Sequence, residues 1–344
     1  MLNQKKIKDQ EISGYRIRKS VQYLFLPTLV DMKVSLSNIL GIQYPVIMAP
    51  MFLVSNSKML IAAGNAGISG AVPALNYRTD EEFRKAIAEV RANSKAPIGV
   101  NIIVNKSNPK AAQQIKTCVE LKVDYIITSL GSPEDVIRQC KPHGIKVFCD
   151  VVDLAYAKKV ESLGADAVIA VNNRAGGHAG NLSPEELIPL LVKNCTISII
   201  SAGGVGNKEE LDKMLTLGAC GVSVGSIFIA SNESDVSQEY KQACVDYGAK
   251  DIVMTTKVSG TPCTVINTPY VQKIGTKQNW FQRFLSKSKR LKKWVKMFTF
   301  LRGMKSLEKS AFGATYKTVW CAGPTIENVT AIKPISEIVK ALVG

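Results

Sequence analysis

From Val46 onward the chain alternates short apolar segments with helix-forming stretches, and this alternation limits the possible fold more than any other feature. The apolar segments are continuous, as expected of parallel strands that are buried on both faces. The eight expected strands are residues 46–50, 67–72, 97–104, 124–129, 145–150, 166–171, 197–202 and 221–226. The seven helices expected between them are residues 57–65, 79–93, 109–122, 133–141, 153–163, 184–193 and 207–217.

Eight strand–helix units predict an α/β fold, a (β/α)8 TIM barrel. The alternative is a doubly wound open sheet, which should carry a GxGxxG turn directly after its first strand. Here the first strand ends instead in Ala49, Pro50 and Met51. We therefore favour the barrel over the open sheet.

The rhythm of units stops after Ile229 and divides the chain into four parts. Residues 36–231 form the expected barrel core, and residues 1–35 precede it as an N-terminal arm. Residues 232–310 carry no clear strand–helix unit, so we expect a helical lid or insertion after strand eight. Residues 311–344 should complete the barrel, with its eighth helix at 335–343.

One segment carries much of the net charge of +16. Residues 280–305 have apolar side chains at helical spacing and basic residues on the other face. Three roles are open for this segment: a lid helix with solvated charges, a docking site for an acidic protein or a nucleotide cosubstrate, and peripheral attachment to an anionic membrane. The chain has no recognised nucleic-acid module, so we expect no nucleic-acid partner.

Cysteine and histidine usage argues against a metal site. The eight cysteines include no CxxC pair, and the two histidines have no ligand-like spacing, so we expect reduced, buried thiols and no metal. No apolar run reaches the roughly 18 to 20 residues that cross a bilayer, and the N-terminus lacks the pattern of an export signal. These features predict a cytoplasmic protein and leave its oligomeric state open.

Glycine-rich sequences end the last two expected strands. Gly203 and Gly204 follow strand seven, and Gly225 and Ser226 are the last residues of strand eight. Backbone N–H groups in such turns can approach an anion closely because no Cβ intervenes, and a following helix favours negative charge. Tight turns alone would explain either pair. Two pairs at neighbouring strand ends predict a phosphate site, at the position where TIM barrels commonly bind phosphate.

His178 is the expected catalytic residue. It lies in the sequence AGGHAG of residues 175–180, where Gly176 and Gly177 leave space beside the imidazole. A histidine at the carboxyl end of a barrel strand can remove a proton from carbon or polarise a substrate oxygen. The alternative is that it caps the segment that follows. His143 is expected to be only a turn residue after a helix.

Two further polar residues lie in or at the end of expected strands. Asn101 lies in strand three, where its buried amide needs partners that a ligand's ring edge could supply. Asp150 ends strand five, where its carboxylate could bind a sugar-like hydroxyl or a lysine. Asp153 is expected to cap the next helix.

Together these motifs resemble those of the nitronate monooxygenase family, formerly called 2-nitropropane dioxygenases, which includes the flavin-dependent enoyl-acyl-carrier-protein reductases. The resemblance covers about residues 36–231, and a weaker similarity covers residues 320–323. It is carried by APM at 49–51, Asn101, AGGH at 175–178, AGGV at 202–205 and GS at 225–226.

The resemblance implies a barrel that binds FMN non-covalently. The isoalloxazine would lie against residues 49–51, with Asn101 near its polar edge and His178 facing the substrate. The phosphate would bind at Gly203, Gly204, Gly225 and Ser226. The remaining residues assigned to the cofactor site are Asp150, Gly176, Gly177, Ser201 and Ala202.

The activity implied is that of a nitronate monooxygenase, which oxidises alkyl nitronates with O2 to a carbonyl compound and nitrite. Two alternatives stay open: an NAD(P)H-dependent enoyl-thioester or quinone reductase on the same flavin site, and a membrane- or partner-tethered flavoprotein with little turnover. The chain departs from the family pattern near the ring and the substrate. Arg174 stands where an acidic residue is common, Asp150 where some members have lysine, and Pro324 where glutamine is expected.

Overall fold

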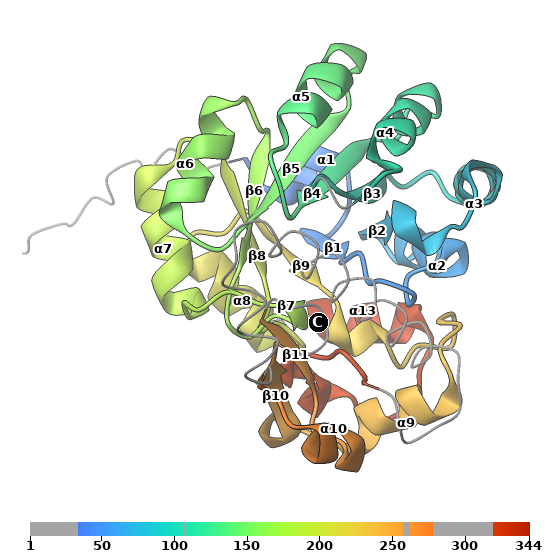
Figure 1. Cartoon of the computed structure of the whole chain (residues 1–344), viewed down its shortest axis with the longest axis vertical. Coiled ribbons are helices and arrows are strands. Elements are labelled where there is room, and N and C mark those ends of the chain that lie inside the picture. Colours follow the sequence, from blue (N-terminus) through green and yellow to red (C-terminus); the bar gives the residue numbers. More distant parts are fainter. Residues whose placement is uncertain (1–33, 106–107, 257–261, 278–318) are drawn as a thin grey trace, which may run out of the picture. The chain divides into compact units, whose positions relative to one another are not determined.

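The computed structural model describes residues 34–105, 108–256, 262–277 and 319–344, which form a TIM barrel (Figure 1). Eight parallel strands pair in the order β1-β2-β3-β4-β5-β6-β8-β9, and β9 pairs with β1 to close the barrel. This closure confirms the predicted fold. The strands are β1 Val46–Met48, β2 Ser69–Pro73, β3 Ile98–Ile103, β4 Tyr125–Ser129, β5 Lys146–Val151, β6 Ala167–Val171, β8 Ser198–Ala202 and β9 Gly221–Val224.

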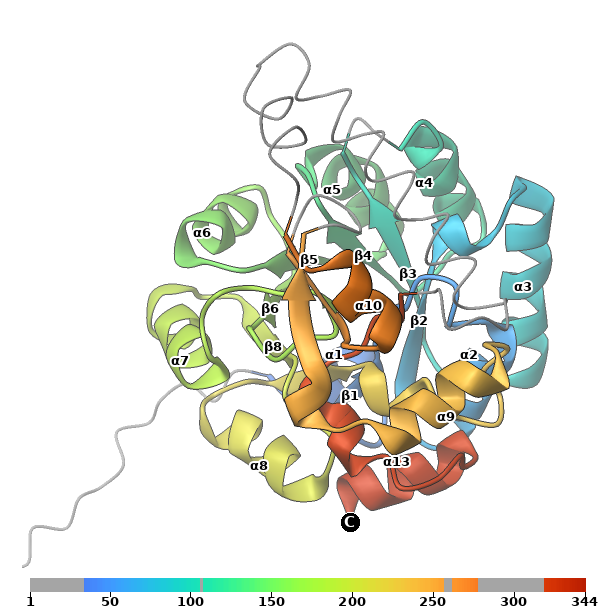
Figure 2. The ribbon, with the colours of Figure 1, turned by 60° about the horizontal axis from the view of Figure 1, so that its bottom comes forward.

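Helices surround the barrel, as Figure 2 shows. Two of them begin with a capping box, at Thr79 with Glu82 and at Ser183 with Glu186, so local sequence fixes where they start. The eighth barrel helix closes the ring near the C-terminus, as predicted. The helices are α2 Ser57–Asn65, α3 Asp80–Asn93, α4 Ala111–Glu120, α5 Glu134–Cys140, α6 Leu154–Ser162, α7 Pro184–Asn194, α8 Lys208–Thr216 and α13 Ile335–Val343.

Short elements fill the connections. Helix α1, Leu36–Leu40, packs at the amino-terminal ends of the strands, where the Leu36 N–H donates to the carbonyl of Cys220 at 2.8 Å. Five 3-10 turns complete the described chain: η1 Ala74–Asn76, η2 Lys141–His143, η3 Ser226–Phe228, η4 Ala249–Asp251 and η5 Pro324–Asn328.

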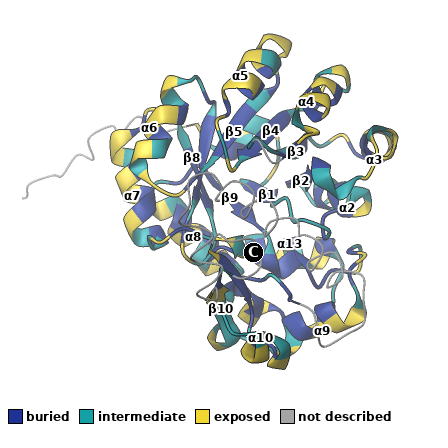
Figure 3. Cartoon of the chain, in the orientation of Figure 1, coloured by how far each residue is buried: buried dark blue, intermediate teal, exposed yellow. Residues whose placement is uncertain are grey.

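The core has two layers, one inside the barrel and one between the strands and the helices. Inside the barrel Tyr125 and Phe148 stack with ring centroids 5.1 Å apart. Gly99 makes room for them, because a Cβ there would lie 2.3 Å from the Tyr125 ring. Figure 3 shows buried strands at the centre and exposed residues on the outer faces of the helices. Packing of both strand faces explains why the strand sequences are continuously apolar.

The chain beyond β9 differs from the helical insertion that the sequence suggested. Its described part contains helices α9, Gln238–Asp246, and α10, Pro269–Ile274, and also strands β10, Ile252–Thr255, and β11, Cys263–Ile266. These strands form an antiparallel sheet with β7, Gly177–His178, in the order β10-β11-β7. The basic segment 280–305 lies outside the described residues, as does nearly all of the arm at 1–35.

The described residues contain neither a membrane-crossing helix nor a cluster of metal ligands. None of the helices described is both long and apolar enough to pass through a membrane. Likewise, no group of three or more His, Cys, Asp and Glu side chains in the described ranges is arranged to hold a metal ion.

Candidate functional site

A cavity of about 710 Å³ lies at the carboxyl ends of the barrel strands. This is a normal volume for a cofactor or small-molecule site, and TIM barrels carry their chemistry at this end. Every residue that the sequence predicted for the site lines the cavity, with the exception of Ser201. The barrel thus brings together residues in or directly after β1, β3, β5, β6, β8 and β9.

Ser201 is buried within β8 and does not line the cavity. Successive strand residues point to opposite faces. Since Ile200 and Ala202 pack with the barrel interior, Ser201 points toward the helix layer. Its hydroxyl makes no hydrogen bond within the described chain. The side chain of Ser201 is therefore not placed to contact a ligand in this cavity.

Unpaired backbone amides mark one end of the cavity. The N–H groups of Gly203, Gly204, Gly225 and Ser226 donate to no acceptor in the described ranges. Buried amides normally have a partner, and these four lie at the ends of the neighbouring strands β8 and β9. We call these four residues the glycine edge. Free amides at neighbouring strand ends suit an anion such as phosphate.

The backbone requires glycine at the two positions after β8, whereas the glycine after β9 has room for a side chain. Gly203 and Gly204 have φ values of +104° and +78°, which favour glycine. A Cβ on Gly203 would also lie 2.4 Å from the Ala175 nitrogen. By contrast, a Cβ on Gly225 would meet only ordinary contacts, the nearest being Met51 Sδ at 3.5 Å. The Ala49–Met51 segment therefore packs directly beside the glycine edge.

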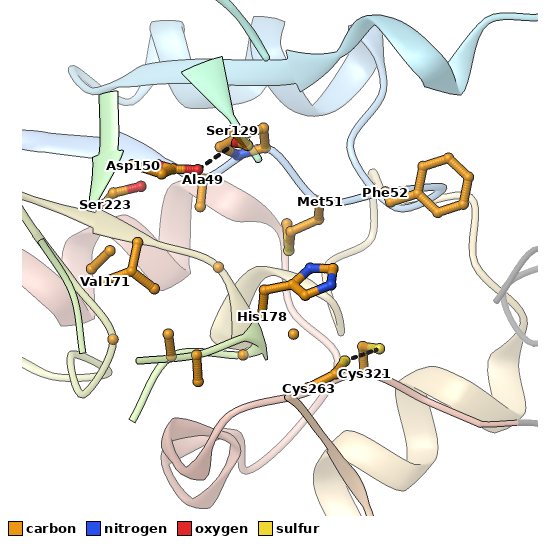
Figure 4. A pocket seen from close by; sticks show the side chains of 18 of the residues that line it. Ala49, Met51, Phe52, Ser129, Asp150, Val171, His178, Ser223, Cys263 and Cys321 are labelled. Atoms are coloured by element: carbon orange, nitrogen blue, oxygen red, sulfur yellow. Dashed lines mark hydrogen bonds between the residues drawn. The ribbon is translucent and has the colours of Figure 1, made fainter. Parts of the chain in front are cut away.

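A chain of polar side chains crosses the cavity floor from β3 to β5. Asn101 Nδ2 donates to Ser129 Oγ at 2.7 Å, and Ser129 Oγ donates to Asp150 Oδ2 at 2.5 Å (Figure 4). Burial raises the pKa of Asp150 to about 6, and the hydrogen bond from Ser129 opposes that rise. Ser129 was missed at the sequence level because a serine at a strand end carries no distinctive signal. The three residues could bind the polar edge of a ring.

The imidazole of His178 points into the cavity toward Met51 (Figure 4). The residue is exposed to the cavity, yet protein surrounds it, and desolvation lowers the pKa of His178 below its usual value. The imidazole is therefore neutral at pH 7 and can accept a proton or donate one N–H hydrogen bond. His143, in η2, is exposed and does not line this cavity.

The wall behind His178 comes from outside the barrel. His178 and Gly177 pair with Cys263 and Thr264 of β11. The hydroxyl of Thr264 donates to the carbonyl of Ala175 at 2.7 Å, which anchors the loop before His178. These contacts join residues almost ninety positions apart. Sequence reasoning missed β11, since this strand lies outside the repeated strand–helix units of the barrel.

The C-terminal segment 319–323, which we call the strap, runs alongside β11. The Ile266 N–H donates to the Trp320 carbonyl at 2.9 Å, and the Tyr240 hydroxyl donates to the Cys321 carbonyl at 2.5 Å. At its end the Gly323 N–H donates to Ser226 Oγ at 2.8 Å. The strap thus connects the wall behind His178 to the glycine edge.

Arg174, which stands where the family often has an acidic residue, also lines the cavity. Its guanidinium lies 3.4 Å from Glu185, and Lys213 lies 2.6 Å from the same carboxylate. All three side chains are partly exposed. The aliphatic part of the Arg174 side chain packs beside Gly204, whereas its guanidinium is directed to Glu185.

Comparison with known proteins assigns the family. The family model described as nitronate monooxygenase matches residues 33–344. The chain belongs to the nitronate monooxygenase family. It is therefore an enzyme, a flavin-dependent oxidoreductase.

Individual relatives carry different names. A protein of Rhodococcus jostii named (3aS,4S,5R,7aS)-5-hydroxy-7a-methyl-1-oxo-octahydro-1H-indene-4-carboxyl-CoA dehydrogenase is 30% identical over 71% of this chain and 68% of its own length. The nitronate monooxygenase of Paraburkholderia phytofirmans is 28% identical over 66% of this chain and 75% of its own. The solved structure of FabK from Thermotoga maritima has a TM-score of 0.78 and 29% identity, covering 90% of this chain and 94% of that one.

The cavity fits a flavin nucleotide by its own chemistry. At the glycine edge, four backbone N–H groups without a partner in the described chain could receive an anion. An apolar segment, Ala49–Met51, suits one side of an aromatic ring, and the polar chain from Asn101 to Asp150 suits its hydrogen-bonding edge. The residues present therefore match a ligand with a phosphate, a flat ring and a polar ring edge.

Proposed function

We propose that the protein binds FMN in this cavity and oxidises alkyl nitronates with O2 to a carbonyl compound and nitrite. One observation carries the proposal: a neutral imidazole, His178, shares one cavity with the glycine edge. A mononucleotide anchored by its phosphate at the glycine edge would leave its ring near the imidazole. FMN, when bound, would supply the capacity to accept electrons from the substrate and pass them to oxygen.

Each part of the cavity then has a separate task. The glycine edge would hold the phosphate of FMN, and the segment Ala49–Met51 would support the ring. Asn101 and Asp150 would bind the polar ring edge, with Ser129 between them fixing both side chains. Because hydrogen bonds fix this polar chain before any ligand binds, little ordering is required on binding.

His178 would act on the substrate. As a neutral base it can take the acidic carbon-bound proton of a nitroalkane, and as an N–H donor it can hold a nitronate oxygen. The desolvation that lowers its pKa keeps the basic form populated at neutral pH. The pairing of β7 with β11 fixes the backbone of His178, so the imidazole starts from a defined position.

A second candidate is NAD(P)H-dependent reduction of an enoyl thioester or a quinone at the same flavin site. The specific support is that a relative with 30% identity is named as a dehydrogenase of a carboxyl-CoA compound. FabK, at 29% identity, has the same fold over nine-tenths of this chain. In this case His178 would face the thioester substrate instead of a nitronate.

Anaerobic flavin bleaching separates these functions. We would purify the protein, identify the flavin that heating releases, and mix the protein separately with ethyl nitronate, NADH and NADPH without oxygen. Bleaching by the nitronate supports the first candidate. Bleaching by a nicotinamide nucleotide, followed by reoxidation with an enoyl thioester, supports the second. A flavoprotein that neither donor bleaches would instead agree with a tethered role, and a preparation that binds no FMN would reject both enzyme functions.

A further inference from the structure

We propose that Cys263 and Cys321 form a redox-sensitive dithiol in the cavity wall, which hydrogen peroxide converts to a disulfide. Their Sγ atoms lie 3.5 Å apart, and both residues line the cavity (Figure 4). The other six cysteines are buried and do not line it. The pair is therefore the group of thiols that a small oxidant entering the cavity would meet.

The backbone holds the two sulfurs in position. Cys263 begins β11 and Cys321 lies in the strap, 58 residues further along the chain. The hydrogen bonds from Ile266 to Trp320 and from Tyr240 to Cys321 keep these segments side by side. A disulfide has an S–S length of about 2.05 Å, so the sulfurs need to approach by roughly 1.5 Å. Rotation of the side chains can supply a movement of that size.

The oxidation is balanced with peroxide alone. One sulfur, as a thiolate, attacks a peroxide oxygen, the O–O bond breaks, and the sulfur becomes a sulfenic acid while the first water leaves. The second sulfur attacks the sulfenic sulfur, the S–S bond forms, and the second water leaves. Two thiols lose two electrons and two protons, and one peroxide becomes two waters.

The two thiols interact directly before any oxidant arrives. Their sulfurs share one hydrogen bond, which either thiol can donate. This hydrogen bond with Cys263, together with burial, raises the pKa of Cys321 well above its ordinary value. Whichever sulfur attacks the peroxide first, the other lies within reach to close the disulfide.

The position of the pair links oxidation to the substrate end of the cavity. Cys263 lies directly opposite His178 in the β11–β7 pairing, where side chains stand about 4.5–5.5 Å apart at Cβ. A disulfide would join β11 covalently to the strap beside the imidazole. The glycine edge, which consists of barrel residues, would keep its geometry.

The test is peptide mapping of the full chain after oxidation. We would treat the purified protein with hydrogen peroxide, block remaining thiols with N-ethylmaleimide, and digest it without reductant. The expected product is a linked pair of peptides containing Cys263 and Cys321, with two of the eight thiols lost. Dithiothreitol should restore both thiols. This result does not depend on which substrate or flavin the protein uses.

Variants provide the control. Cys263→Ser and Cys321→Ser should each abolish the linked peptides, whereas Cys195→Ser, at the end of α7, should retain them. Sulfinic acid at one of the two positions without a link would overturn the proposal, as would a disulfide between other cysteines. Eight intact thiols after peroxide treatment of the folded, unmutated chain would overturn it equally.

Discussion

The two ends of the cavity are built in different ways. The glycine edge consists of backbone at the ends of two adjacent barrel strands, β8 and β9. The wall at His178 consists of side chains on a separate three-stranded sheet and on the strap. Closure of the barrel fixes the first end, whereas long-range pairing outside the barrel fixes the second.

Under the proposed function, this difference would separate cofactor binding from chemistry. A backbone anion cradle accepts any ligand with the right phosphate, because it contains no variable side chain. The wall at His178 depends on residues that can change without disturbing the barrel, as loop variation does in other TIM barrels. We therefore expect mutations at the wall to change turnover and mutations at the glycine edge to change cofactor affinity.

Removal of the imidazole should have the largest effect. His178→Ala should lower turnover by about 10²- to 10⁴-fold, the usual contribution of a general acid–base group. Flavin affinity should stay the same, since the substitution leaves the backbone of the glycine edge unchanged. Steady-state kinetics and flavin titration would measure the two quantities. His143→Ala is the matched control and should match the wild type; equal turnover in both variants would remove His178 from the mechanism.

Substitution at the glycine edge should instead weaken flavin binding. Gly203→Ala adds a Cβ 2.4 Å from a backbone nitrogen and strains a residue with φ of +104°. Strain of about 1–3 kcal/mol predicts flavin binding roughly tenfold to hundredfold weaker. Fluorescence quenching of added FMN would measure the flavin affinity. Gly225→Ala, which has space for a Cβ, should stay within about threefold of the wild type; equal losses in both variants would contradict the cradle.

The buried carboxyl of Asp150 should make the stability of the flavin-free protein depend on pH. Its pKa rises from 3.8 in the unfolded chain to about 6 in the fold, so ionisation penalises the folded state. The penalty is absent below pH 3.8 and complete above about pH 6. Asp150→Asn should therefore raise the free energy of unfolding at pH 8 by on the order of 1–3 kcal/mol.

Urea denaturation at pH 4.5 and pH 8 would measure this effect. The advantage of the Asn variant should shrink at the lower pH, where the wild-type carboxyl is mostly protonated in the fold. A constant difference at both pH values would mean that the carboxyl is not desolvated.

Loss of the anchor behind His178 should have the smallest effect. Thr264→Val removes a hydroxyl whose single hydrogen is donated to the carbonyl of Ala175 at 2.7 Å, with the Gly177 carbonyl next nearest at 3.3 Å. The expected cost is about 1 kcal/mol of stability, with a modest rise in KM because the imidazole is positioned less firmly. Flavin affinity should not change. Weaker flavin binding in this variant would show that the two ends of the cavity are not independent.

Much of the fold could be read from local patterns. All eight barrel strands were predicted, because each is a continuous apolar run between turn signals. The glycine edge and His178 were also predicted, since glycines at consecutive strand ends are visible in the sequence. Strands β10 and β11 were missed, because they lie outside the repeated strand–helix units and form a separate sheet with the two-residue strand β7.

The sequence by itself determined the barrel and the elements at its carboxyl end, because apolar periodicity and turn chemistry act between neighbours in the chain. Only the tertiary structure decided which side chains face one another in the cavity. The Ser129–Asp150 hydrogen bond, the anchor from Thr264 to Ala175 and the approach of Cys263 to Cys321 join residues from 21 to 89 positions apart. Such contacts depend on how packed elements are oriented, which no local pattern records.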